Sequence, residues 1–245
     1  MSLKNIIIFL IIGVTSFLFI SSKEDSNQAR LDVYSEAYLL TLYVKTKEEN
    51  KQLEKETPKI ILENAKIKWD ISKCTPFTPG ADANIPIILG TLDSFGITNI
   101  NQRAYVLATA RHESAQFRTL NEYASGSEYE GRAELGNTQP GDGVKYKGRG
   151  YVQLTGRTNY KLWSKWLNKP FVDNPDLVNE CSEQSAFILV SGMKFGSFTA
   201  HGTLESYIND SKQDFLRARQ LVNGYDQAQL ITNYAIEYRD NGTAK

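Results

Sequence analysis

The sequence GRGYVQLTGRTNY occupies residues 148–160, and the sequence ARHES occupies residues 110–114. ARHES lies at the end of a run in which apolar residues recur at helical spacing. Asn99 or Asn101 can cap the start of this run, because a side-chain oxygen there accepts hydrogen bonds from the first turn of a helix. The pattern predicts a helix that leads directly into Glu113.

The rest of the second half of the chain also has a helical pattern. The Gly-rich region 123–150 interrupts it, and its Pro140–Gly143 sequence is typical of a turn. A loop this long inside a compact domain usually has a function. The fold class is therefore predicted to be mainly α, with a Gly-rich loop or at most a small hairpin. The other helical stretches are residues 85–95, 159–167, 174–193 and 216–245.

Composition restricts the classes of function. Lys plus Arg and Asp plus Glu number 28 each, so the formal net charge is zero. A protein whose main partner is nucleic acid needs a basic face, so no nucleic-acid partner is expected. With only two histidines and two cysteines, and no cluster of them, a metal site is not expected either. His201 lies in a Gly-bounded turn with no nucleophile motif nearby, which argues against a His-dependent hydrolase.

The first 22 residues resemble a targeting segment. Lys4 precedes a mostly apolar run over residues 6–20, and small residues follow it. This order is typical of a secretory signal peptide, although an uncleaved membrane anchor over residues 4–20 remains open. Export would place Cys74 and Cys181 in an oxidising compartment. They either pair there or serve as small buried residues.

The remaining sequence divides into two parts. Residues 23–80 are predicted to be a helical spacer and linker, and a partner-binding helix within them is an alternative. The turn-rich stretch 74–84 contains two prolines and a glycine, which marks a boundary between domains. Residues 81–245 are predicted to form the working domain.

Two motifs in this domain resemble those of glycoside hydrolase family 19, which contains chitinases and phage-type lysozymes. The family's His-Glu-Thr-Gly-Gly pattern appears as HESAQ at residues 112–116, with its last three positions changed. The family's Gly-Arg-Gly-x-Ile-Gln-Leu-Ser/Thr pattern appears as GRGYVQLT at residues 148–155. The resemblance covers about residues 83–240. It implies a lysozyme-like helical fold and a hydrolase that needs no cofactor.

The resemblance also implies roles for particular residues. Glu113 would be the general acid, and partial burial at the helix end would raise its pKa. Thr155 would hold the attacking water, since a hydroxyl can donate and accept at once. Gln153 and Asn159 would bind sugar hydroxyls or acetamides. Arg149 would support the acidic residues and contribute to substrate binding.

The second carboxylate is less certain from the sequence. Glu122 resembles the second acidic residue of phage-type members, but one unbroken helix would separate it from Glu113 by about 13.5 Å. An inverting pair needs carboxyl groups about 6.5–9.5 Å apart, so the helix must end or bend near residues 117–121. Glu128 and Glu130 are alternative bases, and the absence of a strict base is a third possibility.

The leading hypothesis is an exported, inverting hydrolase of β-1,4-linked glycan that contains N-acetylglucosamine. Peptidoglycan is favoured over chitin, because the motifs are more similar to the phage and bacterial branch. Tyr123 is expected to stack on a sugar ring, and a monomer is expected. The alternative hypothesis is a non-catalytic cell-wall glycan-binding module, which the changed residues 114–116 suggest.

Overall fold

The computed structural model describes residues 74–199 and 201–245. The chain divides into two compact units, residues 1–56 and 57–245, and all described residues belong to the second unit. The predicted signal or anchor (1–22), its membrane tether (4–20) and the spacer up to residue 73 lie outside the described residues. No helix within the described part combines the length and apolar character needed to cross a membrane.

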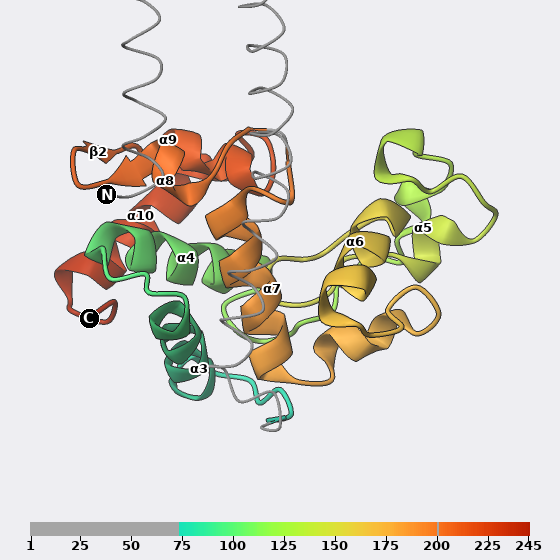
Figure 1. The fold of residues 1–245 in the computed structure, drawn as a ribbon, viewed down its shortest axis with the longest axis horizontal. Helices are drawn as coiled ribbons and strands as arrows, with labels where there is room; N and C mark the ends of the chain where they lie inside the picture. Colours follow the sequence, from blue (N-terminus) through green and yellow to red (C-terminus); the bar gives the residue numbers. More distant parts are fainter. Residues whose placement is uncertain (1–73, 200) are drawn as a thin grey trace, which may run out of the picture. The chain divides into compact units, whose positions relative to one another are not determined.

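Helices dominate the described unit, as the sequence predicts (Figure 1). A single two-stranded antiparallel sheet pairs β1 with β2, with Ile208 opposite Gln213. The longer helices are α3 (Ala81–Ser94), α4 (Ile100–Glu113), α6 (Arg157–Leu167), α7 (Ser182–Phe195) and α10 (Ala228–Asp240). The short elements are η1 (Ser127–Tyr129), η2 (Ala133–Leu135), α5 (Asp142–Lys145), η3 (Pro175–Asn179), α8 (Leu204–Tyr207), β1 (Ile208–Asn209), β2 (Lys212–Gln213), α9 (Phe215–Ala218) and η4 (Arg219–Leu221).

Helix α4 lies inside the unit and carries the predicted N-terminal cap. The Asn99 side chain accepts hydrogen bonds from the amides of Asn101 and Gln102. Residues 102–110 are all buried, because α4 packs against α10 on one side and also contacts α3 and α7. Figure 1 shows α4 beside α10, with α5 and α6 at the opposite end of the view. A helix buried on all sides positions its last residue, Glu113, firmly.

The Gly-rich region is an irregular loop, the first of its two predicted forms. Residues 123–150 contain no hairpin; they form η1, η2 and the single turn of α5. The small hairpin of this domain lies at 208–213 instead. Residues 151–155, which could have alternated as a strand, form a turn in which Leu154 makes an isolated bridge to Arg149. Several glycines here have positive φ, a conformation that glycine adopts readily and that favours turns over regular strand pairing.

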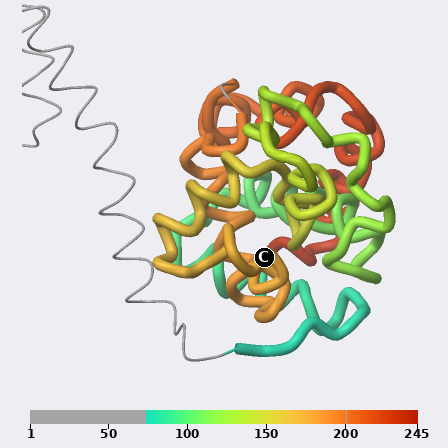
Figure 2. The backbone as a smooth tube through the Cα atoms, turned by 90° about the vertical axis from the view of Figure 1, so that its right-hand side faces the viewer, coloured from blue at the N-terminus to red at the C-terminus, as the bar shows by residue number. Residues whose placement is uncertain are grey.

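The last part of the predicted linker is bound to the helical domain. Cys74 forms a disulfide with Cys181, immediately before α7. Thr75 donates to the Glu183 carboxylate from both its amide and its hydroxyl, at 2.8 and 2.5 Å. Figure 2 shows this teal segment along the lower edge of the unit. Residues 74–80 therefore pack as part of the domain rather than as a free connection.

Candidate active site

A cleft of about 700 Å³ collects most of the predicted site residues. Its polar lining comes from the end of α4, the loop after it, the GRGYVQLT turn and the start of α6, and also from the segments that carry Thr199, His201 and Asn223. Apolar contributions come from the segments around residues 152, 198 and 222. The lining residues that were predicted are Glu113, Glu122, Gln153, Thr155 and Asn159.

Glu113 is paired with an arginine from a distant element. Its Oε1 lies 2.5 Å from Nη1 of Arg219, at the start of η4. The exposed fractions of these side chains are 13% and 3%, so the ion pair is largely shielded from water. Arg219 also donates to the carbonyl of Asp226 at 2.9 Å. The guanidinium is therefore held in place and fixes the orientation of the Glu113 carboxylate.

The chain reverses direction directly after Glu113. Three successive residues, 115–117, have left-handed φ values of 51°, 64° and 58°. Such a conformation costs roughly 1–2 kcal/mol for each residue that is not glycine. Hydrogen bonds offset the cost: the amide of Gln116 donates to the Arg111 carbonyl at 2.7 Å, and the amide of Phe117 donates to Oγ of Ser114 at 3.1 Å. The helix thus ends before Glu122, as that residue's predicted role requires.

Glu122 is half-buried and is held by two donors. The Tyr129 hydroxyl donates to Oε1 at 2.7 Å, and the amide of Gly148 donates to Oε2 at 2.7 Å. A Cβ at position 148 would lie 3.0 Å from Oε2 of Glu122 and 2.6 Å from Oε1 of Gln153, so a larger residue there would displace the ends of these two side chains. Burial and this hydrogen bond raise the pKa of Tyr129, which therefore remains a donor.

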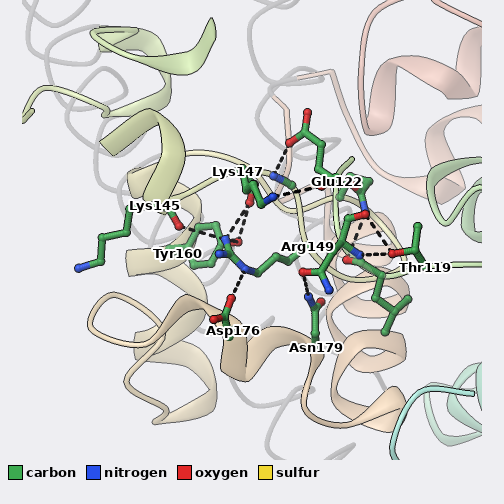
Figure 3. Close-up of polar contacts among 12 residues, drawn as sticks. Thr119, Glu122, Lys145, Lys147, Arg149, Tyr160, Asp176 and Asn179 are labelled. Carbon is green, nitrogen blue, oxygen red and sulfur yellow. Dashed lines mark hydrogen bonds and ion pairs between the residues drawn. The ribbon is translucent and has the colours of Figure 1, made fainter. Parts of the chain in front are cut away.

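Arg149 lies behind this network rather than in the cleft. Its side chain is buried and pairs with Asp176 at 2.8 Å (Figure 3). Nη1 donates to the carbonyls of Lys145 and Lys147, at 3.0 and 3.1 Å. These contacts fix the backbone beside Gly148, whose amide binds Glu122. Arg149 therefore supports Glu122 indirectly, and it is not among the residues that line the cleft.

The three polar residues of the second motif face the same cleft. The Thr155 hydroxyl donates to the carbonyl of Gln153 at 2.8 Å, and the Asn159 amide donates to the carbonyl of Thr155 at 2.8 Å. Gln153 has a left-handed φ of 52°. Strained backbone of this kind is often found at functional sites. The turn thus presents the Thr155 hydroxyl and the Gln153 amide, and the first turn of α6 adds the Asn159 amide.

The other predicted candidates lie away from the cleft lining. The Tyr123 side chain is 78% exposed and does not line the cleft. Glu128 is exposed and likewise absent from the lining. Glu130 accepts hydrogen bonds from the amides of Gly141 and Gly143, at 2.7 and 2.8 Å, and so binds the start of α5. Of the three candidate bases, Glu122 is the one that lines the cleft with Glu113.

Sequence reasoning missed Arg219, Tyr129 and Arg132. Arg219 lies 106 positions after Glu113, and no local pattern connects them. Tyr129 and Arg132 lie in the Gly-rich loop, where length and irregularity alone indicated a function. Within residues 74–199 and 201–245, no group of His, Cys, Asp and Glu could hold a metal ion.

This helical unit, with two carboxylates in one polar cleft, is similar to known carbohydrate-active proteins. A Haemophilus influenzae (strain ATCC 51907 / DSM 11121 / KW20 / Rd) protein named "Glycosyl hydrolase family 19 domain-containing protein" is 30% identical, over 34% of this chain and 56% of its own length. The chain thus spans a little over half of this curated relative. This sequence similarity confirms the resemblance to family 19. No protein-family model matches the chain.

Two solved structures are also similar. Chitinase C from Streptomyces griseus HUT6037 is 20% identical, with a TM-score of 0.49, over 74% of this chain and 91% of its own. A bacterial family 19 chitinase is 18% identical, with a TM-score of 0.42, over 74% of this chain and 94% of its own.

Proposed function

We propose that this protein is a glycoside hydrolase that cleaves β-1,4 bonds in a glycan containing N-acetylglucosamine, with inversion at the anomeric carbon. The observation that carries the proposal is one cleft lined by Glu113, Glu122 and Thr155. Inverting cleavage needs a carboxylic acid, a carboxylate and a positioned water. The similarity to a protein named for family 19 supports the same chemistry.

In the proposed mechanism, Glu113 donates a proton to the leaving oxygen as the glycosidic bond breaks. Glu122 accepts a proton from the attacking water, so that the hydroxyl adds to the opposite face of the sugar. Thr155 orients that water, and Gln153 and Asn159 hold sugar substituents. The donors Tyr129 and Gly148 hold the Glu122 carboxylate in one orientation within the cleft.

The test uses the full-length protein and its Glu113→Gln variant on purified peptidoglycan and on chitin. Mass spectrometry of the soluble products should find oligosaccharide fragments with the wild type. The rate should fall about 100-fold or more in the variant, the usual contribution of a general acid. Glu128→Gln is the matched control, because this exposed carboxylate lies outside the cleft lining. Equal rates for Glu113→Gln and the wild type would reject the proposal.

The alternative hypothesis, a non-catalytic glycan-binding module, was suggested by the changed residues 114–116, and their position gives it little support. The changed positions 114–116 form the turn after α4 and do not line the cleft. Ser114 is buried against the Ala110 carbonyl, and Gln116 donates to the Tyr234 hydroxyl at 2.7 Å. The departure from the family pattern therefore alters a supporting turn. Binding of sugar oligomers without any release of reducing ends would restore this reading.

We also propose that the protein is exported. The apolar run over residues 6–20 supports this, as does the Cys74–Cys181 disulfide, since such bonds persist in oxidising compartments. Fractionation of the producing cells should find the protein outside the cytoplasm. Carbonate extraction of membranes then separates a cleaved signal peptide from a retained anchor.

A further inference from the structure

We infer that Arg132 recognises a carboxylate on the glycan, which makes a muramic-acid polymer the substrate class in preference to neutral chitin. This inference rests on the proposed function. Arg132 is the only arginine among the described residues that line the cleft. Chitin carries no acid group. In peptidoglycan, alternate sugars carry a lactyl group that ends in a carboxylate or in a short acidic peptide.

Arg132 is connected to the candidate base, Glu122, through Tyr129. Its guanidinium lies over the Tyr129 ring, 5.8 Å from the ring centroid, and the Tyr129 hydroxyl donates to Glu122. The amide of Arg132 donates to the Tyr129 carbonyl at 3.3 Å, which closes the turn between them. A carboxylate bound by Arg132 would therefore belong to a sugar close to Glu122.

The Arg132 guanidinium has N–H groups that no described residue accepts. Its Nε donates to Glu134 at 2.7 Å, and the two side chains are 45% and 63% exposed. Its terminal nitrogens make no hydrogen bond to another residue within 74–199 and 201–245. Planar guanidinium groups bind carboxylates through paired N–H donors. Glu134 thus orients the guanidinium and leaves one edge available for a ligand.

The charges of the cleft make such a cation necessary for an acidic substrate. The Glu122 carboxylate lines the cleft and would repel a second carboxylate. Glu113 and Arg219 offset each other in their buried ion pair, so this pair supplies no net positive charge for an acidic ligand. Arg132 has only an exposed partner. A neutral glycan would gain little from this arrangement, whereas an acidic glycan would need it.

The experiment measures binding in the Glu113→Gln background, where turnover is suppressed. The ligands are chitotetraose, the peptide-free tetrasaccharide of alternating N-acetylglucosamine and N-acetylmuramic acid, its lactyl methyl ester, and the peptide-bearing tetrasaccharide. Titration calorimetry gives a Kd for each ligand before and after Arg132→Gln. Arg217→Gln is the matched control, because it removes the same charge from an exposed arginine that lies outside the cleft lining.

We expect Arg132→Gln to weaken binding of a free-acid ligand about tenfold more than binding of chitotetraose, the scale of one charge-assisted contact. If Arg132→Gln selectively weakens binding of the peptide-free ligand, and the parent protein binds the methyl ester of that ligand equally weakly, then Arg132 recognises the lactyl carboxylate. Selective loss only with the peptide-bearing ligand assigns the peptide acids. Equal loss with every ligand, or no loss, overturns the inference and leaves hydrolysis by Glu113 intact. Failure to bind any oligomer rejects the proposed function as well.

Discussion

Two carboxylates of one residue type have different surroundings in this cleft. Glu113 faces a buried guanidinium, whereas Glu122 faces a phenol and a backbone amide. The two side chains are therefore held by different kinds of donor, a charged one for Glu113 and neutral ones for Glu122. The consequences can be tested by changing the partners.

Tyr129→Phe removes the hydroxyl that donates to Glu122 and keeps the ring. We expect kcat to fall about tenfold, because a hydrogen bond to a charged group contributes about 1.5–3 kcal/mol. KM should change little if Tyr129 acts by positioning the base. Steady-state kinetics on a soluble oligosaccharide, beside a thermal unfolding curve, separates this effect from misfolding. An unchanged kcat would show that Gly148 alone holds Glu122.

His112 should make the fold sensitive to mild acid. Burial, assisted by Arg219 and opposed by Glu113, lowers the pKa of His112 below its ordinary value of 6.5. The unfolded chain therefore binds a proton at a higher pH than the folded chain does. Stability that is present above pH 6.5 is lost as pH falls toward the lowered folded pKa. Urea midpoints at pH 7 and pH 5 should differ less in His112→Gln than in the wild type, and an equal difference would contradict this.

At the scale of elements, buried polar contacts help to fix the irregular loops. Asp142, at the start of α5, is buried and accepts from Nε of Arg157, the first residue of α6, at 2.8 Å. Arg157 also donates its amide to Asn137 at 2.8 Å. These contacts connect the Gly-rich loop to the helix that carries Asn159. They hold the wall of the cleft in place.

Asp142→Asn should destabilise the domain by about 2–3 kcal/mol, because it leaves the partly buried Arg157 without its counter-charge. The hydrogen bonds from Arg157 hold the pKa of Asp142 below its ordinary value of 3.8. Their contribution is therefore present above that pH and is lost as pH falls through the folded pKa. Urea unfolding at pH 7 measures the change. Asp240→Asn, which breaks an exposed pair with Arg239, should have no measurable effect.

At the scale of the whole described unit, distant segments are joined covalently. The Cys74–Cys181 disulfide closes a loop of 107 positions and ties residues 74–80 to the start of α7. The same segment packs Phe77 against Tyr151, with ring centroids 6.4 Å apart, next to the motif turn. A segment that the sequence assigned to a linker therefore contacts the turn that carries Gln153 and Thr155.

Replacing both cysteines by serine should lower the free energy of unfolding by about 3 kcal/mol, because the open chain gains conformational entropy when it unfolds. A reductant should lower the melting temperature of the wild type and leave that of the double variant unchanged. Calorimetric scans with and without reductant measure both effects. A wild type that melts at the same temperature in reductant would show that the bond adds no stability.

The sequence by itself determined the helices and the identity of the polar residues in the cleft. Helical periodicity and the Asn99 cap are local properties, so α4 and α6 could be predicted close to their true bounds. The predicted stretch 174–193 instead divides into η3 and α7, and α7 begins only at Ser182. The need for the chain to turn before Glu122 also followed from the rise of a helix. The position of the hairpin could not be predicted, because short strands have weak local signals.

Only the tertiary structure decided the partners of those residues. Arg219 meets Glu113 across 106 positions, and Cys74 meets Cys181 across 107. Such contacts depend on how buried helices pack, and packing is a property of the whole core rather than of any short stretch. The choice of Glu122 over Glu128 and Glu130 as the carboxylate in the cleft has the same origin. Loop backbone, set by glycine turns and buried arginines, directs one of these three side chains inward.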